Sequence, residues 1–303
     1  MVAPLLEVRG LRKSFPRERT VLEVVAGRRP EALHAVRDVS FVLQPGETLG
    51  IVGESGCGKS TLGRCITGIH QPSAGEILWQ GLPLARLGGR KAQSRHIQMI
   101  FQDPYSSLNP RMTIGETIRE ALVVHTVDAT GAGRAKRIDE LLSLVGLPAM
   151  VKDRLPHALS GGQRQRVSIA RALAVEPHLI VADEPVSALD ASVQAQIINL
   201  FEELREQLGV AFIFIAHDLN VVRHISHRVA VMYLGQIVEI GRSDDLFSDP
   251  RHPYTRALLS AVPMPDPRVR ATAASLEGEL PDPSRPPKGC SFSTRCQIGR
   301  AHV

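Results

Sequence analysis

The chain reads Gly53-Glu54-Ser55-Gly56-Cys57-Gly58-Lys59-Ser60-Thr61 directly after the apolar run 49–52. This stretch is a complete G-x-x-x-x-G-K-[ST] phosphate loop behind a predicted strand. Its glycines let successive backbone N–H groups point inward, and the positive end of the following helix adds to them, so the loop should cradle phosphate oxygens. Lys59 is expected to reach the β- and γ-phosphates and Ser60 to offer a hydroxyl to Mg²⁺. The alternative, a chance glycine-rich turn, is disfavoured because every motif position is filled.

The composition excludes several classes of protein. The 303 residues carry a formal net charge of +5, but Lys and Arg are spread among acidic residues, so the charge does not indicate a nucleic-acid partner. The longest apolar run, 210–216, is too short to cross a bilayer, and residues 1–4 lack a secretory pattern. We therefore expect a cytosolic chain whose four cysteines stay reduced.

Apolar patterns outline the elements around the loop. Polar alternation predicts strands over 5–15 and 35–43, separated by a surface loop over 16–30. Apolar runs predict buried parallel strands over 179–182 and 210–216. Three-to-four spacing predicts helices from the phosphate loop to about 69 and over 113–124, 133–145, 162–175, 193–208 and 254–261. Turn residues predict a strand pair from 75 to 101 and a hairpin over 229–233 and 237–240.

Polar residues follow the two predicted parallel strands. Asp183 and Glu184 come after 179–182, and His217 comes after 210–216. The phosphate loop also follows a strand, so all three groups should meet at the carboxyl edge of one sheet, where open α/β sheets bind ligands. We interpret Asp183 as holding Mg²⁺ through water and Glu184 as the general base for the attacking water.

A second anion site is predicted farther along the chain. Leu159-Ser160-Gly161-Gly162-Gln163 precedes a predicted helix and should expose backbone N–H groups at its positive end. One nucleotide needs one phosphate loop, so this segment is expected to serve nucleotide bound to another subunit. The alternative is an ordinary helix N-cap at Ser160 or Gly161.

Together these motifs resemble the ATP-binding cassette (ABC) family. Leu159–Gln163 is similar to its signature motif, Phe101-Gln102-Asp103-Pro104 to its Q-loop, Ser187-Ala188-Leu189-Asp190 to its D-loop, and His217 to its switch histidine. Phe15 falls where the family stacks an aromatic ring on adenine.

The resemblance implies an α/β fold with a P-loop NTPase (RecA-like) parallel sheet, an N-terminal antiparallel β subdomain, a helical signature-motif subdomain and an irregular C-terminal extension. The ATP-binding domain should span 1–240, with the helical subdomain at about 104–165, and the extension 241–303.

The resemblance also implies ATP and Mg²⁺ as cofactors and a head-to-tail dimer with a second ATPase subunit, identical or related. Nucleotide would lie between the phosphate loop of one subunit and Ser160, Gly161 and Gly162 of the other. The implied catalytic residues are Glu184, His217 and Gln102; the implied Mg²⁺ residues are Ser60, Gln102 and Asp183; and the other implied nucleotide contacts are Phe15, residues 53–61, Gln163 and Asp190.

A narrower resemblance covers nearly the whole chain. The segments 103–111, 186–190 and 250–259, the last reading Pro-Arg-His-Pro-Tyr-Thr-Arg-Ala-Leu-Leu, look like ATPase subunits of bacterial dipeptide/oligopeptide importers, closer to the F-type subunit. This implies peptide uptake by a chain bound at the cytoplasmic face of the cell membrane to two integral permease subunits, indirectly served by an external solute-binding protein. The segment after Gln102 is the expected permease contact.

Three alternatives stay open. Related importers handle nickel, glutathione or other small solutes. Soluble cassette ATPases act in DNA repair or translation, but they typically carry two cassettes or long coiled coils, and this sequence has one phosphate loop and no heptad run. An exporter subunit is the third alternative, and the His-Pro-Tyr tail argues against it.

Cys290 and Cys296 match the opening of the family's four-cysteine pattern, which in some members holds an iron–sulfur cluster. Two thiolates fall short of the four that a [4Fe-4S] cluster takes, so we expect one only in a longer chain. The last residues, 297–303, are what a common sequencing adapter would encode. We therefore expect the true reading frame to continue and the extension to be truncated here.

Overall fold

The computed structural model describes residues 3–16, 32–125, 127, 130–261 and 280–296. Its strands are β1 (Leu6–Phe15), β2 (Leu33–Leu43), β3 (Thr48–Val52), β4 (Ala74–Trp79), β5 (Leu82–Pro83), β6 (Ile97–Ile100), β7 (Leu179–Asp183), β8 (Ala211–Ile215), β9 (Arg228–Tyr233) and β10 (Gln236–Arg242). Its α-helices are α2 (Lys59–Ile66), α3 (Arg90–His96), α4 (Pro104–Ser107), α5 (Ile114–Val124), α6 (Gly131–Leu144), α7 (Gly161–Leu173), α8 (Ala191–Leu208), α9 (Leu219–Ile225), α10 (Ser243–Ser248) and α11 (Pro253–Ser260). Short 3₁₀ turns lie at Leu84–Arg86, Ala149–Asp153 and Pro156–Ala158.

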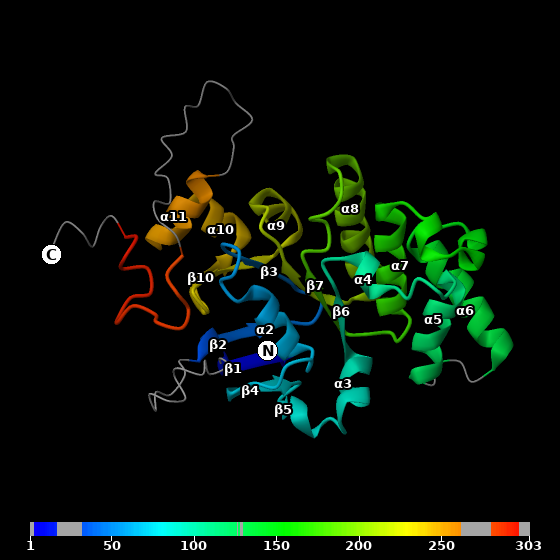
Figure 1. Ribbon diagram of the computed structural model, residues 1–303, viewed down its shortest axis with the longest axis horizontal. Helices are drawn as coiled ribbons and strands as arrows, with labels where there is room; N and C mark the ends of the chain where they lie inside the picture. The colour runs from blue at the N-terminus through cyan, green and yellow to red at the C-terminus, as the bar shows by residue number, and fades with distance from the viewer. Residues whose placement is uncertain (1–2, 17–31, 126, 128–129, 262–279, 297–303) are drawn as a thin grey trace, which may run out of the picture.

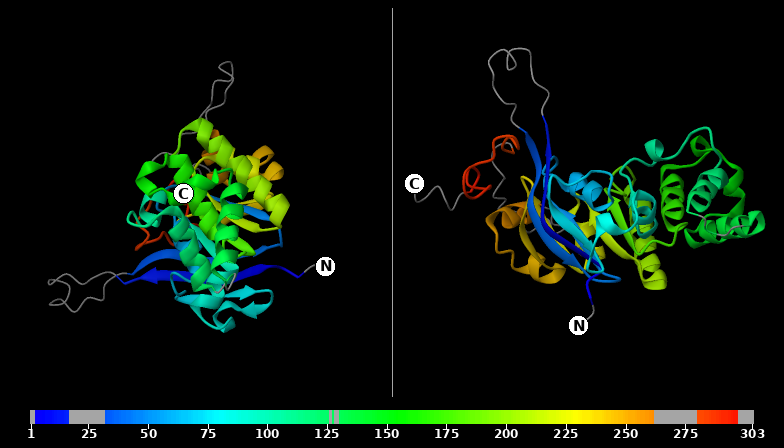
Figure 2. Two further views of the ribbon diagram at one scale, coloured as in Figure 1. Left: turned by 90° about the vertical axis from the view of Figure 1, so that its right-hand side faces the viewer. Right: turned by 90° about the horizontal axis from the view of Figure 1, so that it is seen from below.

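Two sheets organise these elements, as the predicted fold class requires. The larger has the order β10-β9-β3-β8-β7-β6 and is parallel except for β10, which pairs antiparallel with β9. The smaller, antiparallel sheet has the order β2-β1-β4-β5. Helices α5, α6 and α7 lie at one end of the molecule and the segment 280–296 at the other (Figures 1 and 2).

The core lies on both faces of the larger sheet because side chains alternate along each buried strand. Ile213 and Ile215 of β8 pack with α2 and the antiparallel sheet, whereas Phe212 and Phe214 face α8. The sheet is therefore covered on both sides, which fixes the positions of its carboxyl ends.

We expect Phe201→Ala in α8 to lower the free energy of unfolding by about 3–5 kcal/mol, the usual cost of emptying an aromatic site. Phe201 is fully buried, and its ring packs edge-on against Phe212 at 5.5 Å and Phe214 at 5.6 Å between centroids. Denaturant titration followed by circular dichroism measures the change. Leu208→Ala, at the exposed end of the same helix, is the control and should change stability by about 0.5 kcal/mol or less. Equal losses in the two variants would contradict the packing argument.

One secondary-structure prediction is wrong. The strand pair expected from 75 to 101 is a β4–β5 hairpin, after which α3 intervenes and β6 joins the other sheet beside β7. No side chain of α3 is buried, so its sequence carries no apolar period to reveal a helix. The short helices α9 and α10 were likewise not predicted, and most of the predicted loop 16–30 lies outside the described residues.

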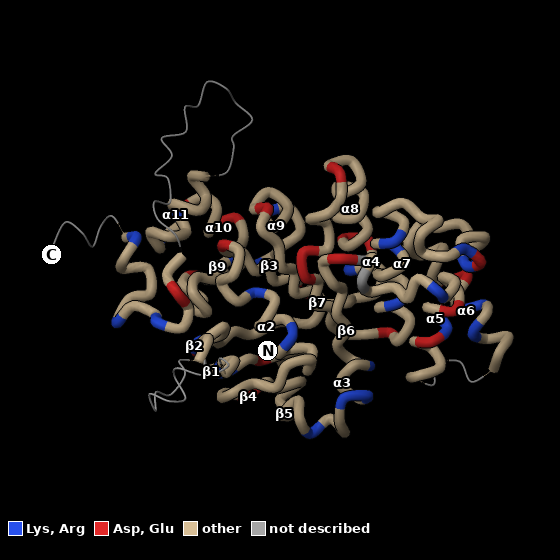
Figure 3. Tube along the Cα trace, viewed as in Figure 1, with Lys and Arg blue, Asp and Glu red and all other residues tan. Residues whose placement is uncertain are grey.

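The distribution of charged residues and the length of the helices can be compared with the expectations from the sequence. Basic and acidic residues are interspersed along the described trace (Figure 3). Among the helices that the structure describes, each is too short or too polar to cross a bilayer.

Candidate functional site

Three parallel strands deliver the predicted residues to one edge of the larger sheet. β3 and β7 both pair with β8, with Ile51 and Asp183 each opposite Ile215. The backbone N–H of Glu184 donates to the carbonyl of Ile215 at 2.9 Å, which fixes the first residue beyond β7. The predicted convergence of the strand ends is therefore confirmed.

The phosphate loop requires glycine at its two ends. A Cβ on Gly53 would lie 2.1 Å from the carbonyl oxygen of Met232, and one on Gly58 would lie 2.1 Å from that of Ala35. Gly58 also has φ of 108° just before α2 begins at Lys59. Only glycine fits at positions where the backbone has a positive φ and lies this close to neighbouring carbonyls. The resulting turn leads the loop directly into the N-terminus of α2.

Lys59 is a buried cation inside this loop. It is 5% exposed, and its Nζ donates to the carbonyls of Gly53 at 2.8 Å and Glu54 at 2.9 Å. Both acceptors are neutral, so they offset only part of the cost of burying the charge. A phosphate group would supply the opposite charge, so the loop fits an anionic ligand.

Ser60 and Asp183 form the polar pair beside the loop. Ser60 Oγ donates to Asp183 Oδ1 at 2.8 Å, and Asp183 is 3% exposed. Burial raises the pKa of Asp183, against the hydrogen bond from Ser60 and the positive charges of Arg64 and Lys59, which lower it. Since burial makes this carboxylate costly as an anion, a divalent cation here would stabilise it. One carboxylate and one hydroxyl fit Mg²⁺, which usually keeps waters and takes its remaining ligands from substrate phosphates.

Glu184 lies between two polar side chains. Its Oε2 accepts from Gln102 Nε2 at 2.9 Å and lies 3.4 Å from His217 Nδ1. Glu184 also adopts φ of 49°, a left-handed conformation that is unfavourable for a residue with a side chain and is typically retained at functional sites. The carboxylate is thus held in one orientation, which suits a base that takes a proton from water.

A cavity of about 390 Å³ lies over these groups. The predicted residues that line it are Phe15, residues 55–61, Gln102, Glu184 and His217. Phe15 is at its rim, where Lys13 Nζ lies 4.9 Å from the ring centroid and the His70 ring packs edge-on at 5.3 Å. The sequence did not predict four further groups of the lining, which are Leu33–Ala35, Leu234, Gly235 and Pro283.

The signature segment does not line this cavity within the described residues. Ser160 caps α7, where Ser160 Oγ accepts from Gln163 N at 3.3 Å and Gln163 Oε1 accepts from Ser160 N at 3.1 Å. Asp190 caps α8 by accepting from Val193 N at 3.0 Å, a bond that lowers the pKa of Asp190. The N-cap alternative thus describes what Ser160 does in the single chain, and the N–H groups of Gly161 and Gly162 remain the predicted anion site.

The described residues do not fit an iron–sulfur cluster. Cys290 is exposed and Cys296 is half-buried, and no group of three or more His, Cys, Asp or Glu in the described part of the chain could hold a metal ion. Residues 297–303 lie outside the described residues.

Comparisons with known proteins show the family to which the chain is similar. A family model described as ABC transporter matches residues 36–187, and one described as oligopeptide/dipeptide transporter, C-terminal region, matches residues 238–302. The oligopeptide transport ATP-binding protein OppF of Haemophilus influenzae is 53% identical over 272 residues, which cover 88% of this chain and 82% of that protein. The oligopeptide transport ATP-binding protein AppF of Bacillus subtilis is 50% identical over 301 residues, covering 98% and 90%.

Solved structures show the same fold. The ATP-binding cassette MJ0796, a dimer in a post-hydrolysis state with ADP and Pi, superposes with a TM-score of 0.68 at 28% identity, covering 78% of this chain and 98% of that one. A CbiO1 structure from Clostridium perfringens also gives a TM-score of 0.68 at 28% identity, covering 82% and 92%.

Proposed function

We propose that this chain, which belongs to the ABC transporter family and is an ATPase, energises the uptake of di- or oligopeptides across a cell membrane. The main support for peptides as the transported solute is that residues 238–302 match the C-terminal region of oligopeptide/dipeptide transporters. The two oligopeptide-transport relatives at about 50% identity, whose matches span most of both chains, support it.

In this proposal each residue in or beside the cavity has a separate role in ATP binding or hydrolysis. Lys59 and the loop N–H groups would orient the β- and γ-phosphates, and Phe15 would stack on the adenine. Ser60, Asp183 and Gln102 would hold Mg²⁺. Mg²⁺ supplies charge neutralisation at the phosphates. Glu184 takes the proton from the attacking water, while Gln102 and His217 keep its Oε2 in place.

We also propose that a second ATPase subunit completes the site. Ser160, Gly161, Gly162 and Gln163 would contact the nucleotide of the partner subunit, with Asp190 close by. Two facts support this: the segment lies outside the chain's own cavity, and the related cassette MJ0796 is a dimer with ADP and Pi.

Gly161→Asp is expected to abolish ATP-dependent dimerisation, because a carboxylate at the first position of α7 would repel the phosphate of the opposite subunit. Small-angle scattering measures this in a Glu184→Gln background with ATP, on the chain alone and mixed with its partner ATPase subunit. Gly131→Asp makes the same change at the first position of α6, where a Cβ meets open space, and should leave dimerisation intact. A Glu184→Gln protein that stays monomeric with ATP in both settings would reject the shared site.

Two integral membrane permeases, served by an external solute-binding protein, are the proposed further partners at the cytoplasmic face. A groove of about 330 Å³ lies beside the segment after Gln102 and is lined by Phe101 and Val124 among others. Tyr105 in that segment is 54% exposed and Val124 50%, so apolar surface is available for contact.

Co-purification tests the partner class. Recovery of hydrophobic membrane subunits supports transport, whereas nucleic acid retained at high salt would support a DNA-repair or translation ATPase. Identifying the neighbouring genes and screening ligands of a solute-binding protein encoded there then tests the cargo. Selective binding of nickel or glutathione in place of peptides would overturn the peptide assignment.

A further inference from the structure

Glu54, the second residue of the phosphate loop, is held at each of its polar groups. Its backbone N–H donates to Tyr254 Oη at 3.0 Å, and its carbonyl accepts from Lys59 Nζ at 2.9 Å. Its two carboxylate oxygens accept from Arg295 Nη1 at 2.9 and 3.0 Å. Two of the three partner residues therefore come from the chain beyond residue 240, outside the region that carries the nucleotide motifs.

These two contacts are partly shielded from water. Tyr254 is fully buried, with its ring centroid 4.6 Å from that of Tyr233 and 5.5 Å from that of Phe292. The Arg295 side chain is 5% exposed, against 26% for Glu54. An ion pair shielded to this degree is less weakened by solvent than a fully exposed pair, and losing one partner leaves the other charge uncompensated.

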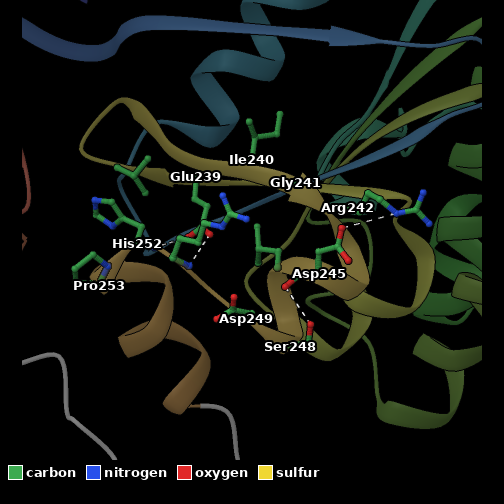
Figure 4. A pocket seen from close by; sticks show the side chains of 12 residues that line it. Glu239, Ile240, Gly241, Arg242, Asp245, Ser248, Asp249, His252 and Pro253 are labelled. Carbon is green, nitrogen blue, oxygen red and sulfur yellow. Dashed lines mark hydrogen bonds and ion pairs between the residues drawn. The ribbon is translucent and has the colours of Figure 1, made fainter.

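The start of α11 is itself fixed to the larger sheet. Glu239 of β10 accepts from the N–H of Arg251 at 2.8 Å and of His252 at 3.0 Å, at the wall of a cavity of about 820 Å³ (Figure 4). His252 then caps α11 by accepting from Tyr254 N at 3.1 Å. The tyrosine that meets the phosphate loop is thus placed by the edge hairpin of the sheet.

The segment 280–296 also reaches the nucleotide cavity directly. The carbonyl of Pro283 accepts from His34 N at 3.4 Å, and Pro283 is part of the cavity wall. Ser291 accepts from Arg37 Nη1 at 3.3 Å, which anchors the segment to β2. The segment 280–296 therefore lies against β2 and places Arg295 beside the loop.

We propose that the C-terminal extension is a working part of the nucleotide site and that Arg295 is a positioning residue for the phosphate loop. This rests on the proposed function, since it requires ATP in this cavity. Arg295 neutralises Glu54 and fixes the first turn of the loop before nucleotide arrives. Both effects favour ATP binding: a neutralised Glu54 does not repel phosphate, and a preorganised loop loses less freedom on binding.

Arg295→Met is the test, in the full chain. We expect the Kd for a fluorescent ATP analogue and the KM for ATP to rise about 10-fold, the loss expected for one charge-assisted hydrogen-bonded pair. Because the groups around Glu184 are untouched, kcat should change by about 2-fold or less. Lys288→Met removes an exposed cation of the same segment and should leave both constants unchanged. Arg295→Lys keeps the charge and should recover part of the affinity.

A double variant separates positioning from general loss of structure. Adding Glu54→Gln to Arg295→Met removes the uncompensated carboxylate, so ATP affinity should return toward the wild-type value. An Arg295→Met protein with wild-type KM, or a double variant no better than the single one, would overturn the inference. If the wild-type chain binds no ATP, the proposed function fails; if wild type and Arg295→Met bind it equally, only the role of Arg295 fails.

Discussion

Replacing Glu184 with Gln is expected to preserve ATP binding and to slow hydrolysis by about 10²–10⁴-fold, the usual contribution of a general base. Gln has nearly the shape of Glu and can still meet Gln102 and His217, but its amide cannot take a proton from water. Lys59 and Ser60, which are proposed to contact phosphate and Mg²⁺ respectively, lie on α2 and are unchanged. Single-turnover experiments measure the rate of hydrolysis, and titration calorimetry measures the affinity for ATP.

Glu176→Gln is the matched control. Glu176 precedes the opposite end of β7, shares the left-handed conformation with φ of 55°, and is paired with Arg137 at 3.0 Å on the surface. Its hydrolysis rate should equal that of wild type. Near-normal turnover by Glu184→Gln would remove Glu184 from the role of base and leave the carboxylate as a structural group.

The parts of the site that the sequence predicted are those encoded by short contiguous patterns. The phosphate loop is specified by glycine spacing, and Asp183, Glu184 and His217 each follow an apolar run whose length predicts a buried strand. Parallel strands bring their carboxyl ends to one edge, so the meeting of these residues follows from topology once the strands are identified. The parallel sheet was predictable for the same reason, whereas the antiparallel subdomain, the helical subdomain and the C-terminal extension were expected from the resemblance to the ABC family.

The remaining parts depend on contacts between segments far apart in the chain. Arg295 meets Glu54 across 241 positions, and Pro283 reaches the cavity from the same proline-rich tail. No periodicity links such residues, since the described segment 280–296 has no helix or strand to set a register. The exposed helix α3 was missed for a different reason: a helix that buries no side chain leaves no apolar stripe in its sequence.

Replacing Lys59 with Ala is expected to weaken ATP binding by about 10- to 100-fold, because a charge-assisted hydrogen bond to phosphate is lost from a site shielded from water. The ammonium is desolvated within the loop and donates to the carbonyls of Gly53 and Glu54. Exchanging these neutral acceptors for phosphate oxygens therefore gains attraction at little further desolvation cost. Lys59→Ala loses the attraction between the ammonium and phosphate, whereas it retains the loop geometry set by Gly53 and Gly58.

Titration calorimetry with ATP and Mg²⁺ measures this loss, with Lys91→Ala on the exposed helix α3 as the control. The control alters net charge by the same amount, so equal losses in the two variants would indicate long-range electrostatics in place of contact at the loop. An unchanged affinity in Lys59→Ala would count against phosphate binding by residues 53–61. Measuring the variant with adenosine as well locates the effect: Lys59→Ala should bind the nucleoside as wild type does, since the adenine is expected at Phe15, away from the ammonium.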